Sequence, residues 1–576
     1  MSSFFDRLFR RFLRKNTVSK DREEIVFGEM IKLLRKPLLE LGFKFSNDEI
    51  RRNINIPKRT DKGDYTFPCS ALAKKISYTP HEFAMSLRTK MGSPSETYFD
   101  SVEVAEGNVC FFINRKSFAR EVLWDVIYQR DGYGKGNEGK NHLILGSKKV
   151  VLDFSHLTIG KSPGMNHLLA IASGNSLSEI YRFRGFTPIK INYFRTGWLN
   201  LARLVSGFEK FGNEEELEKM PMEQLGEIYK KTKNYKLEQK LDLIRSMQIR
   251  DRKSIMLWRA FRELSIESFD DFNKTFGVKF DEYSGELESL GRVFVFVRKL
   301  QELGLLTESN GSLGVNLKKY GLGFCEIKGR NGILNENALE ISEAIRRYGK
   351  YKFAKMIYGV DENEVPLKQV FKILELMGYE WARNCFVVKY GFYSAKNGRR
   401  LSGNENNVSA KEVFKKLISF VGGKKVSENS FLFVRNSVFY KSLEKDDSGK
   451  VTFDVHSLFS GSSSFLHIKK TYDEASILVK DAPESDEFIV HDLDEAEFEL
   501  VKKISRLNKV SLDACAKMNP SIIYEYCCDI TNTFDKFRNS CEIYDAEKKS
   551  FRIALVESFR QVLRNSMNLI GIKINQ

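Results

Sequence analysis

One stretch of the chain, residues 150–200, constrains the fold more than any other. It opens with a run of β-branched and apolar residues, VVLDF (150–154), which predicts a buried parallel strand. A loop with glycine and proline follows, and apolar residues at helical spacing then predict a helix over 167–184. A second short strand, PIKINYF (188–194), comes directly after. This order predicts a βαβ unit, whose loop lies at a helix N-terminus that favours phosphate.

The length and the charge of the chain bound its class. At 576 residues the chain is too long for one hydrophobic core, and we expect about three or four domains. The 42% hydrophobic and 29% charged residues are typical of a soluble globular protein, and no apolar run approaches the roughly 20 residues of a membrane-spanning helix. Lys and Arg number 93 against 76 Asp and Glu, so the net charge of +17 favours a polyanionic partner, above all nucleic acid.

Cysteine and histidine usage argues against a metal centre. The eight cysteines include no CxxC pair and the seven histidines are scattered, so the sequence predicts no zinc site and no tightly bound metal. We expect buried or free thiols in a reducing compartment, and therefore a cytoplasmic protein.

The N-terminal segment carries a different signal. Residues 1–16 interleave apolar and basic side chains with a single acid, Asp6, which is typical of a basic amphipathic helix. Such a helix can lie on a membrane or on RNA or bind a partner, and its lack of acids also fits a transit peptide. An extension that packs on its own domain is an equal alternative. We treat residues 1–24 as a separate segment.

The βαβ stretch also carries a specific motif. In residue type and spacing it resembles the first half of the catalytic domain of arginyl-tRNA synthetase, a class I aminoacyl-tRNA synthetase. The residues kept at matching spacing are Asp153, Phe154, Ser155, Ile159, Lys161, His167, Leu168, Gly174, Asn175, Leu177, Gly185, Asn192 and Tyr193. A match kept over the whole unit is specific.

Segments on both sides extend the resemblance. GDYTFPCSALAKK (63–75) is similar to the family's N-terminal additional domain, RRYGKYKFAKMIYGV (346–360) to its catalytic domain, and ALVESFRQVLRNSMNLIGI (554–572) to its anticodon-binding bundle. The resemblance implies a multidomain α/β plus all-α fold. It has an N-terminal α/β additional domain, a Rossmann-like class I catalytic core with insertions, and a C-terminal helical bundle of the DALR type. The implied bounds are 25–135, 142–425 and 426–576.

The first catalytic signature departs from the family pattern. The family's HIGH signature has the pattern His-x-Gly-His, and its place is taken here by Gly164-Met165-Asn166-His167. The family's Ser-Pro-Asn is replaced by His156-Leu157-Thr158. Its Gly-Asp-Trp-Gly after the second strand is replaced by Arg195-Thr196-Gly197-Trp198. The scaffold is therefore kept while its active-site residues are changed.

The second signature, KMSKS, is absent. It would fall in residues 394–407, where only Arg399 and Arg400 carry suitable charge. Many family members lack this loop's lysine and use one just upstream of HIGH, a place that Lys161 occupies here. The loss is thus compatible with activity.

The resemblance implies a nucleotide site and an arginine site. Lys161 and His167 are the implied catalytic residues, because such groups stabilise charge that develops on phosphates. The implied ATP-binding residues are Gly164, Asn166, His167, Arg399 and Arg400. A guanidinium substrate requires a buried carboxylate that accepts forked hydrogen bonds. The implied arginine-binding residues are Ser155, Thr158, Glu286, Glu336 and Glu340.

Two of the arginine-site positions are changed. Glu336 and Glu340 fall where the family has a tyrosine and an aspartate one helical turn apart. Glu340 can serve although its side chain is one methylene longer, whereas Glu336 removes a hydrogen-bonding wall. Exposed helix glutamates are the alternative for both, and a solvated loop carboxylate is the alternative for Glu286.

The C-terminal bundle is the implied reader of the anticodon loop. Exposed bases are read by stacking and by hydrogen bonds to their edges, for which Tyr524, Tyr526, Arg560 and Arg564 are candidates. Packing within the bundle is the alternative for each.

Two functions from different classes remain open. One is arginine–tRNA ligase, with ATP and Mg²⁺, L-arginine and tRNA(Arg) as ligands and arginyl-adenylate as the intermediate. The other is a catalytically silent synthetase-like protein that keeps tRNA or partner binding, since losing two or three preorganised groups removes most of the rate. A nucleotide-binding metabolic enzyme is disfavoured because it leaves the flanking domains unexplained. We expect a monomer, with other translation components as further candidate partners.

Overall fold

The computed structural model describes most of the chain. The described residues are 22–57, 62–144, 146–361, 363–401, 409–422, 427–446, 448–480 and 488–574. The basic segment predicted over 1–16 lies outside them, as does the end of the stretch in which the second signature was expected. The described residues form two compact units. Unit 1 takes them from Met1–Gly136, Ile468–Asp513 and Glu525–Ser566, and unit 2 from Asn137–His467, Ala514–Tyr524 and Met567–Gln576.

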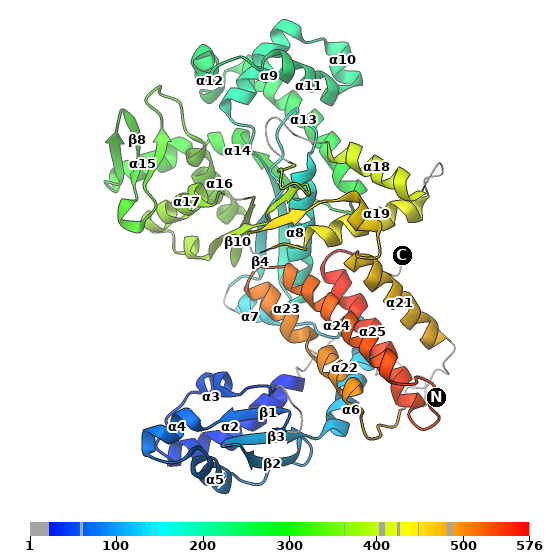
Figure 1. Cartoon of the computed structure of the whole chain (residues 1–576). Helices are drawn as coiled ribbons and strands as arrows, with labels where there is room; N and C mark the ends of the chain where they lie inside the picture. The colour runs from blue at the N-terminus through cyan, green and yellow to red at the C-terminus, as the bar shows by residue number, and fades with distance from the viewer. Residues whose placement is uncertain are drawn as a thin grey trace, which may run out of the picture. The chain divides into compact units, whose positions relative to one another are not determined.

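Unit 1 contains a small antiparallel sheet with helices beside it (Figure 1). Its N-terminal elements are α2 (Arg22–Glu40), α3 (Asn47–Asn53), β1 (Tyr65–Pro68), α4 (Ser70–Ala73), α5 (Pro80–Lys90), β2 (Phe99–Ala105), β3 (Asn108–Ile113) and α6 (Arg115–Gln129). The strand order is β1-β3-β2, and α5 packs against β2 and β3. Capping boxes start α3 and α5, because Ser46 and Thr79 each pair with a glutamate three residues later.

The C-terminal region is helical, as predicted. Its helices are α21 (Ser464–Lys480), α22 (Glu495–Ser505), α23 (Leu507–Ala516), α24 (Ser521–Ser540) and α25 (Lys549–Leu569). In unit 1 the rings of Phe534 and Phe559 stack with centroids 4.0 Å apart, which joins α24 to α25. Phe118 of α6 meets Phe498 of α22 edge to face, so α6 and the C-terminal helices share one core.

Unit 2 is organised on a five-stranded sheet in which every neighbouring pair is parallel. The strand order is β11-β10-β4-β5-β6. The strands are β4 (Lys149–Asp153), β5 (Thr187–Phe194), β6 (Glu282–Gly285), β10 (Lys355–Val360) and β11 (Cys385–Lys389). Helix α8 (Met165–Phe183) joins β4 to β5 and packs against β4, β5 and β10 (Figure 1). The predicted βαβ unit is thus confirmed, with its strands and helix within two residues of their predicted bounds.

Long connections between the strands add further layers to unit 2. The remaining helices are α7 (Glu138–Ile144), α9 (Trp198–Phe211), α10 (Glu214–Lys219), α11 (Pro221–Lys231), α12 (Leu241–Gln248), α13 (Arg252–Thr275), α14 (Glu286–Leu290), α15 (Val293–Glu302), α16 (Glu336–Tyr351), α17 (Val365–Leu376), α18 (Ala410–Gly422), α19 (Glu428–Ser442) and α20 (Val455–Phe459). The remaining strands are β7 (Leu306–Ser309), β8 (Ser312–Asn316), β9 (Phe324–Lys328), β12 (Phe392–Ser394) and β13 (Lys450–Thr452). Figure 1 shows α9 to α12 gathered in one helical group. The segment 346–360, which resembles the family's catalytic domain, forms the end of α16, a turn and β10.

No helix in the described ranges combines the length and the apolar character needed to cross a bilayer. The cysteines are free thiols, and all of them except Cys528 are buried.

Gly174 allows α8 to lie close to the sheet. A Cβ at this position would stand 2.2 Å from the ring of Phe154, which directly follows β4. We expect Gly174→Ala to destabilise the protein by about 1–3 kcal/mol, because this overpacking outweighs the higher helix propensity of alanine. Urea unfolding measures the change. Gly226→Ala, in α11 with no atom within 4 Å of the new Cβ, is the matched control and should be neutral or stabilising.

Candidate active site

The candidate active site is built on the loop that joins β4 to α8. Parallel strands end at a common edge of the sheet, so the loops after β4, β5, β6 and β10 meet there. Ser155 and His156 leave β4 with φ values of +88° and +46°, a left-handed conformation that costs non-glycine residues about 1–3 kcal/mol each. The turn brings the loop beside the end of β5, where the Ile159 N–H donates to Thr196 Oγ1 at 3.2 Å. Strained backbone of this kind concentrates at functional sites.

Lys161 lies in this loop with its ammonium over an aromatic ring. Its Nζ is 4.9 Å from the ring centroid of Tyr229, whose hydroxyl donates to the carbonyl of Ile159 at 2.9 Å. Burial lowers the pKa of Lys161, and the nearby Arg203 lowers it further. Within the described ranges, Lys161 pairs with no carboxylate. Its charge is therefore available to an anionic ligand such as phosphate.

His167 lies in the first turn of α8 and is held by backbone. Its Nδ1 accepts a hydrogen bond from the Gly164 N–H at 2.9 Å. Burial lowers the pKa of His167 to about 4, so the ring is neutral at pH 7. With Nδ1 as the acceptor, the ring proton is on Nε2. Of the two predicted catalytic residues, Lys161 offers a charge and His167 offers a neutral hydrogen-bond donor.

Glu286 and Glu336 both contact the segment that follows β5. Glu286, the first residue of α14, accepts from the Thr196 N–H at 2.6 Å and from the Gly197 N–H at 3.0 Å, both through Oε1. Glu336, the first residue of α16, holds its Oε1 2.8 Å from the place that a Cβ on Gly197 would take. Glu286 is buried, so its alternative as a solvated loop carboxylate is wrong. Glu336 is exposed, which agrees with the alternative that it is an exposed helix glutamate.

Glu340 is paired with an arginine of the same chain. The Nε of Arg195 donates to Glu340 Oε1 at 2.8 Å. Glu340 is only 7% exposed, so its alternative as an exposed helix glutamate is wrong. Burial raises the pKa of Glu340, and Arg195 offsets this only in part. Arg195 was not predicted as a site residue, although its place where the family has glycine was the signal that could have identified it.

The Arg195–Glu340 contact is a single hydrogen bond. Glu340 Oε2 and Arg195 Nη2 are both buried, and neither meets a hydrogen-bond partner within the described chain. An arginine and a carboxylate frequently form two parallel hydrogen bonds instead. Each partner thus keeps one polar atom available to another group.

A buried ion network underlies the site. Arg347 donates to Asp153 Oδ2 and to Glu343 Oε1, both at 2.8 Å. Its guanidinium carbon lies 5.4 Å and 5.1 Å from the ring centroids of Tyr193 and Tyr358. Burial raises the pKa of Asp153, but Arg347, His156 and Arg195 together more than offset this and leave the pKa well below its usual range. Asp153 was recognised as a motif residue, whereas its partner Arg347 was not identified as part of the site.

The two hydroxyl candidates for the arginine site differ in environment. Ser155 is buried, and its Oγ meets no hydrogen-bond partner in the described residues. Asn192 Nδ2 of β5 is likewise buried and unpartnered there. Thr158 is half-buried and its carbonyl accepts from the Lys161 N–H at 3.2 Å. Buried polar atoms normally find partners, so Ser155 and Asn192 are suited to a polar ligand.

The pKa of Glu286 makes a testable link between the site and stability. Burial raises it to about 7, against 4.5 in an exposed carboxyl, although the Thr196 and Gly197 N–H groups lower it in part. The folded state therefore binds this proton more tightly, and the resulting stability is fully present below pH 4.5 and lost as the pH rises through 7. We expect Glu286→Gln, which is neutral at every pH, to exceed the unaltered chain in stability by about 3 kcal/mol at pH 8. At pH 4 the gain should nearly vanish, which paired urea titrations at the two pH values would measure.

The predicted ATP-binding residues lie on two segments. Gly164 precedes α8 and forms an isolated antiparallel bridge with Ser409, which lies beyond the second-signature stretch. Asn166 is half-buried in the first turn of α8. Arg399 and Arg400 lie after β12, and Arg400 donates to Asp361 Oδ2 at 3.0 Å. The bridge thus brings Gly164 of the first signature beside Ser409, which follows the stretch where the second signature was expected.

The two tyrosines predicted to read tRNA are engaged within the protein. Tyr526 is 6% exposed and its hydroxyl donates to the Lys503 carbonyl at 2.8 Å. Because the described structure buries this side chain, a base could not stack on its ring without a rearrangement, so the prediction for Tyr526 is corrected to a packing role. The Tyr524 hydroxyl donates to Glu444 Oε2 at 2.8 Å, and its ring contacts Tyr440 with centroids 4.7 Å apart.

The two predicted arginines lie one turn apart on α25 and are half-buried. Arg560 pairs with Glu557 at 2.7 Å, and Arg564 pairs with Asp131 at 2.6 Å. Both carry charge on a helix face, which is compatible with contacts to phosphate.

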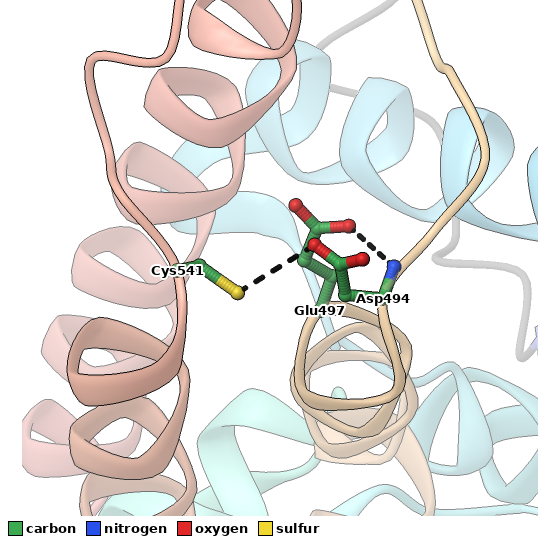
Figure 2. A group of neighbouring side chains, drawn as sticks. All are labelled: Asp494, Glu497 and Cys541. Carbon is green, nitrogen blue, oxygen red and sulfur yellow. Dashed lines mark hydrogen bonds between the residues drawn. The ribbon is translucent and has the colours of Figure 1, made fainter.

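Unit 1 contains a separate group of possible metal ligands, whose carboxylates are paired with basic side chains of the same unit. Figure 2 shows Asp494, Glu497 and Cys541 together, with the Asp494 N–H donating to Glu497 Oε2 at 2.7 Å. Arg552 donates to Glu497 at 2.7 Å and to Asp494 at 2.8 Å, and Lys548 donates to Asp494 at 3.1 Å. Burial raises the pKa of the Cys541 thiol, which disfavours the thiolate that a metal needs. The group is an ion-pair network at the start of α22.

Comparison with protein families assigns three segments of the chain. Residues 136–415 match the catalytic domain of the class I tRNA synthetases for arginine, described as "tRNA synthetases class I (R)". Residues 28–113 match the arginyl-tRNA synthetase N-terminal domain, and residues 467–576 match the DALR anticodon binding domain. These are the three domain types that the resemblance implied.

Full-length relatives and solved structures agree with these matches. The arginine–tRNA ligase of Clostridium perfringens is 28% identical over 552 residues, which cover 92% of this chain and 96% of the relative. The arginine–tRNA ligase of Pediococcus pentosaceus is 28% identical over 551 residues, with the same two coverages. The Thermus thermophilus arginyl-tRNA synthetase structure has a TM-score of 0.71 at 17% identity and covers 94% of this chain and 98% of its own. The Plasmodium falciparum enzyme has a TM-score of 0.77 at 15% identity, covering 95% and 98%, so the fold is shared. This chain belongs to the arginyl-tRNA synthetase family of class I aminoacyl-tRNA synthetases.

Proposed function

We propose that this protein is an arginine–tRNA ligase. The carboxylate of L-arginine would attack the α-phosphate of ATP to give arginyl-adenylate and pyrophosphate, and the arginyl group would then pass to the terminal ribose of tRNA(Arg). The observation that carries the proposal is the convergence of Glu286 and Glu340, both buried, on residues 195–197 at the carboxyl edge of the sheet. Buried carboxylates are what a guanidinium substrate needs, because forked hydrogen bonds offset its desolvation.

The chemistry needs no protein nucleophile. Positioning and stabilisation of charge on the phosphates supply the rate, as in other phosphoryl and adenylyl transfers. Lys161 would bind the ATP phosphates through its ammonium, and His167 would donate from Nε2. Mg²⁺ enters with ATP as part of the substrate, and Gly164, Asn166, Arg399 and Arg400 would line the nucleotide site.

The arginine site and the tRNA surface complete the proposal. Ser155 and Thr158 would hold polar groups of the amino acid, with Glu336 at the rim. Arg560 and Arg564 would contact the tRNA, and Tyr524 would do so after exchanging its present partners. We place the protein in the cytoplasm as a monomer, with domains over 25–135, 142–425 and 426–576 after an extension of 24 residues.

A second candidate function is a catalytically silent protein that binds tRNA. The observation that favours it is Arg195, whose guanidinium already holds the carboxylate expected to bind substrate arginine. The altered first signature, Gly164-Met165-Asn166-His167, points in the same direction. Retained domains and a net charge of +17 fit both functions.

The test combines catalysis with binding. ATP–pyrophosphate exchange should occur with L-arginine and cognate tRNA, and should fall to background with L-citrulline, the neutral isostere. Filter binding of the same tRNA is measured in parallel. Arginine-dependent exchange above background rejects the silent function, whereas tight tRNA binding with no exchange under any tRNA condition rejects the ligase.

A further inference from the structure

Arg195 brings a guanidinium of the chain to a carboxylate that a guanidinium substrate would need. It follows β5 directly, and its Nε donates to Glu340 Oε1 at 2.8 Å. The other oxygen of Glu340 is buried and has no hydrogen-bond partner among the described residues. A buried acceptor left unpaired is costly, so Glu340 still favours one more donor.

Glu286 presents a second acceptor beside the same segment. Its Oε1 is filled by the Thr196 and Gly197 N–H groups, and its Oε2 is buried without a partner in the described chain. Glu340 and Glu286 thus contact consecutive residues, 195 to 197, and each keeps one oxygen. The nearby Asp153 is bound to Arg347 through Oδ2 at 2.8 Å, and its Oδ1 lies 3.3 Å from His156 Nε2. Among the carboxylates that contact residues 195–197 in the described chain, Glu340 and Glu286 each have one unpartnered oxygen.

Two guanidinium groups cannot both use Glu340 fully. Arg195 occupies one oxygen, so an incoming guanidinium would gain a single hydrogen bond there and would lie beside a like charge. Arg195 can also leave, because its side chain is 27% exposed and is joined to Glu340 by one hydrogen bond while Nη2 is unpaired in the described structure. The contact therefore has the properties of a displaceable one.

We propose that Arg195 is an internal guanidinium that competes with substrate L-arginine for the site made by Glu340 and Glu286, and so sets how tightly the chain binds arginine. The proposed function enters only as the source of the substrate's identity. While Arg195 is seated, the apparent affinity is reduced by the fraction of molecules in which the site is open. Removing Arg195 leaves a buried carboxylate that a free guanidinium can neutralise.

Binding to the full chain tests this without relying on catalysis. Isothermal titration at pH 7.5 compares the unaltered chain, Arg195→Ala and Arg195→Ala/Glu340→Gln, with three probes: L-arginine, agmatine, which lacks the carboxylate, and L-citrulline, which lacks the charge. We expect Arg195→Ala to bind L-arginine and agmatine at least about tenfold tighter than the unaltered chain, with no gain for citrulline. The double variant should lose that gain.

Two further variants keep the test decisive. Arg262→Ala is the matched control, since Arg262 also pairs one glutamate, Glu288, at 3.0 Å, and it should bring no gain in arginine binding. If Arg195→Ala does not fold, Arg195→Gln retains a neutral donor to Glu340 while removing the competing charge. It should show the same order of affinities.

The outcomes separate the inference from the proposed function. Unchanged arginine binding in the folded Arg195 variant, or a gain that persists in the double variant, overturns the inference. Weaker binding of L-arginine with unchanged agmatine also overturns it, because Arg195 would then bind the substrate carboxylate. A gain in arginine affinity supports it even if the unaltered chain shows no exchange, and exchange without a gain in the variant leaves the ligase standing while the inference falls.

Discussion

Replacing Arg347 by leucine is expected to destabilise unit 2 by about 3–5 kcal/mol. The substitution removes the guanidinium that neutralises Asp153 and Glu343 inside the core, where both carboxylates are inaccessible to water. Glu343 keeps Arg346 at 2.6 Å, so most of the penalty falls on Asp153. Urea unfolding followed by tryptophan fluorescence measures the loss, because Trp198 and Trp258 are buried in the core of unit 2.

The pH dependence identifies the cause of that loss. In the unaltered chain Arg347, aided by His156 and Arg195, holds the pKa of Asp153 low against the effect of burial, so this contribution is present above pH 3.8 and is lost as the pH falls. The variant lacks the largest of these opposing charges, so the pKa of Asp153 should rise and the deficit should be largest at pH 7 and shrink as the pH falls. Arg298→Ala is the control, since Arg298 is 82% exposed and pairs with Glu302 on the surface. It should change stability by less than about 0.5 kcal/mol. A deficit independent of pH would indicate lost packing and not an unpaired charge.

Replacing Lys161 by alanine is expected to slow arginine-dependent ATP–pyrophosphate exchange by about 10²–10³-fold. The ammonium is held over the Tyr229 ring and pairs with no carboxylate in the described chain, so it is free to bind phosphate. His167, neutral at pH 7, cannot replace that charge. The measurement is the exchange rate at saturating arginine and tRNA, together with the affinity for ATP.

A second lysine, Lys230, provides a control that distinguishes a specific role of Lys161 from the loss of one positive charge. Lys230 of α11 is exposed and pairs with Glu227, so Lys230→Ala changes the net charge equally and should leave exchange within about twofold. Lys161→Arg should retain part of the rate, because it keeps a cation in the loop. Unfolding and tRNA filter binding should be unchanged in Lys161→Ala. A Lys161→Ala chain that exchanges as fast as the unaltered one would remove Lys161 from the catalytic site.

Local patterns were sufficient to predict the central unit of the fold. The strand, loop, helix and second strand over 150–194 follow from periodicity, because each element buries one face and its apolar residues repeat at the spacing of that element. The family resemblance also implied that Glu286 and Glu340 share a site although they are far apart in the sequence, and both contact residues 195–197. Periodicity did not identify the orientation of Tyr526, because an aromatic residue on a helix can face a partner helix or solvent with the same local sequence.

The charge pairs of the site were outside the reach of sequence reasoning. Arg195 and Glu340 are 145 residues apart, and Arg347 and Asp153 are 194 apart. Whether a carboxylate is free for a substrate or already neutralised depends on which distant cation lies within hydrogen-bond reach. Neither periodicity nor a motif of neighbouring residues gives the distance between a carboxylate and a cation that is far away in the sequence.

The amino-acid order by itself determined the βαβ core, the helical C-terminal region and the family's order of domains, since each of these depends on contacts between residues near in sequence or on a motif of fixed spacing. Only the tertiary structure decided that Glu340 is held by Arg195, that Asp153 and Glu343 share Arg347, and that His167 is neutral. The physical reason is that burial and charge pairing set protonation and ligand access, and both arise only after the chain has brought distant side chains together.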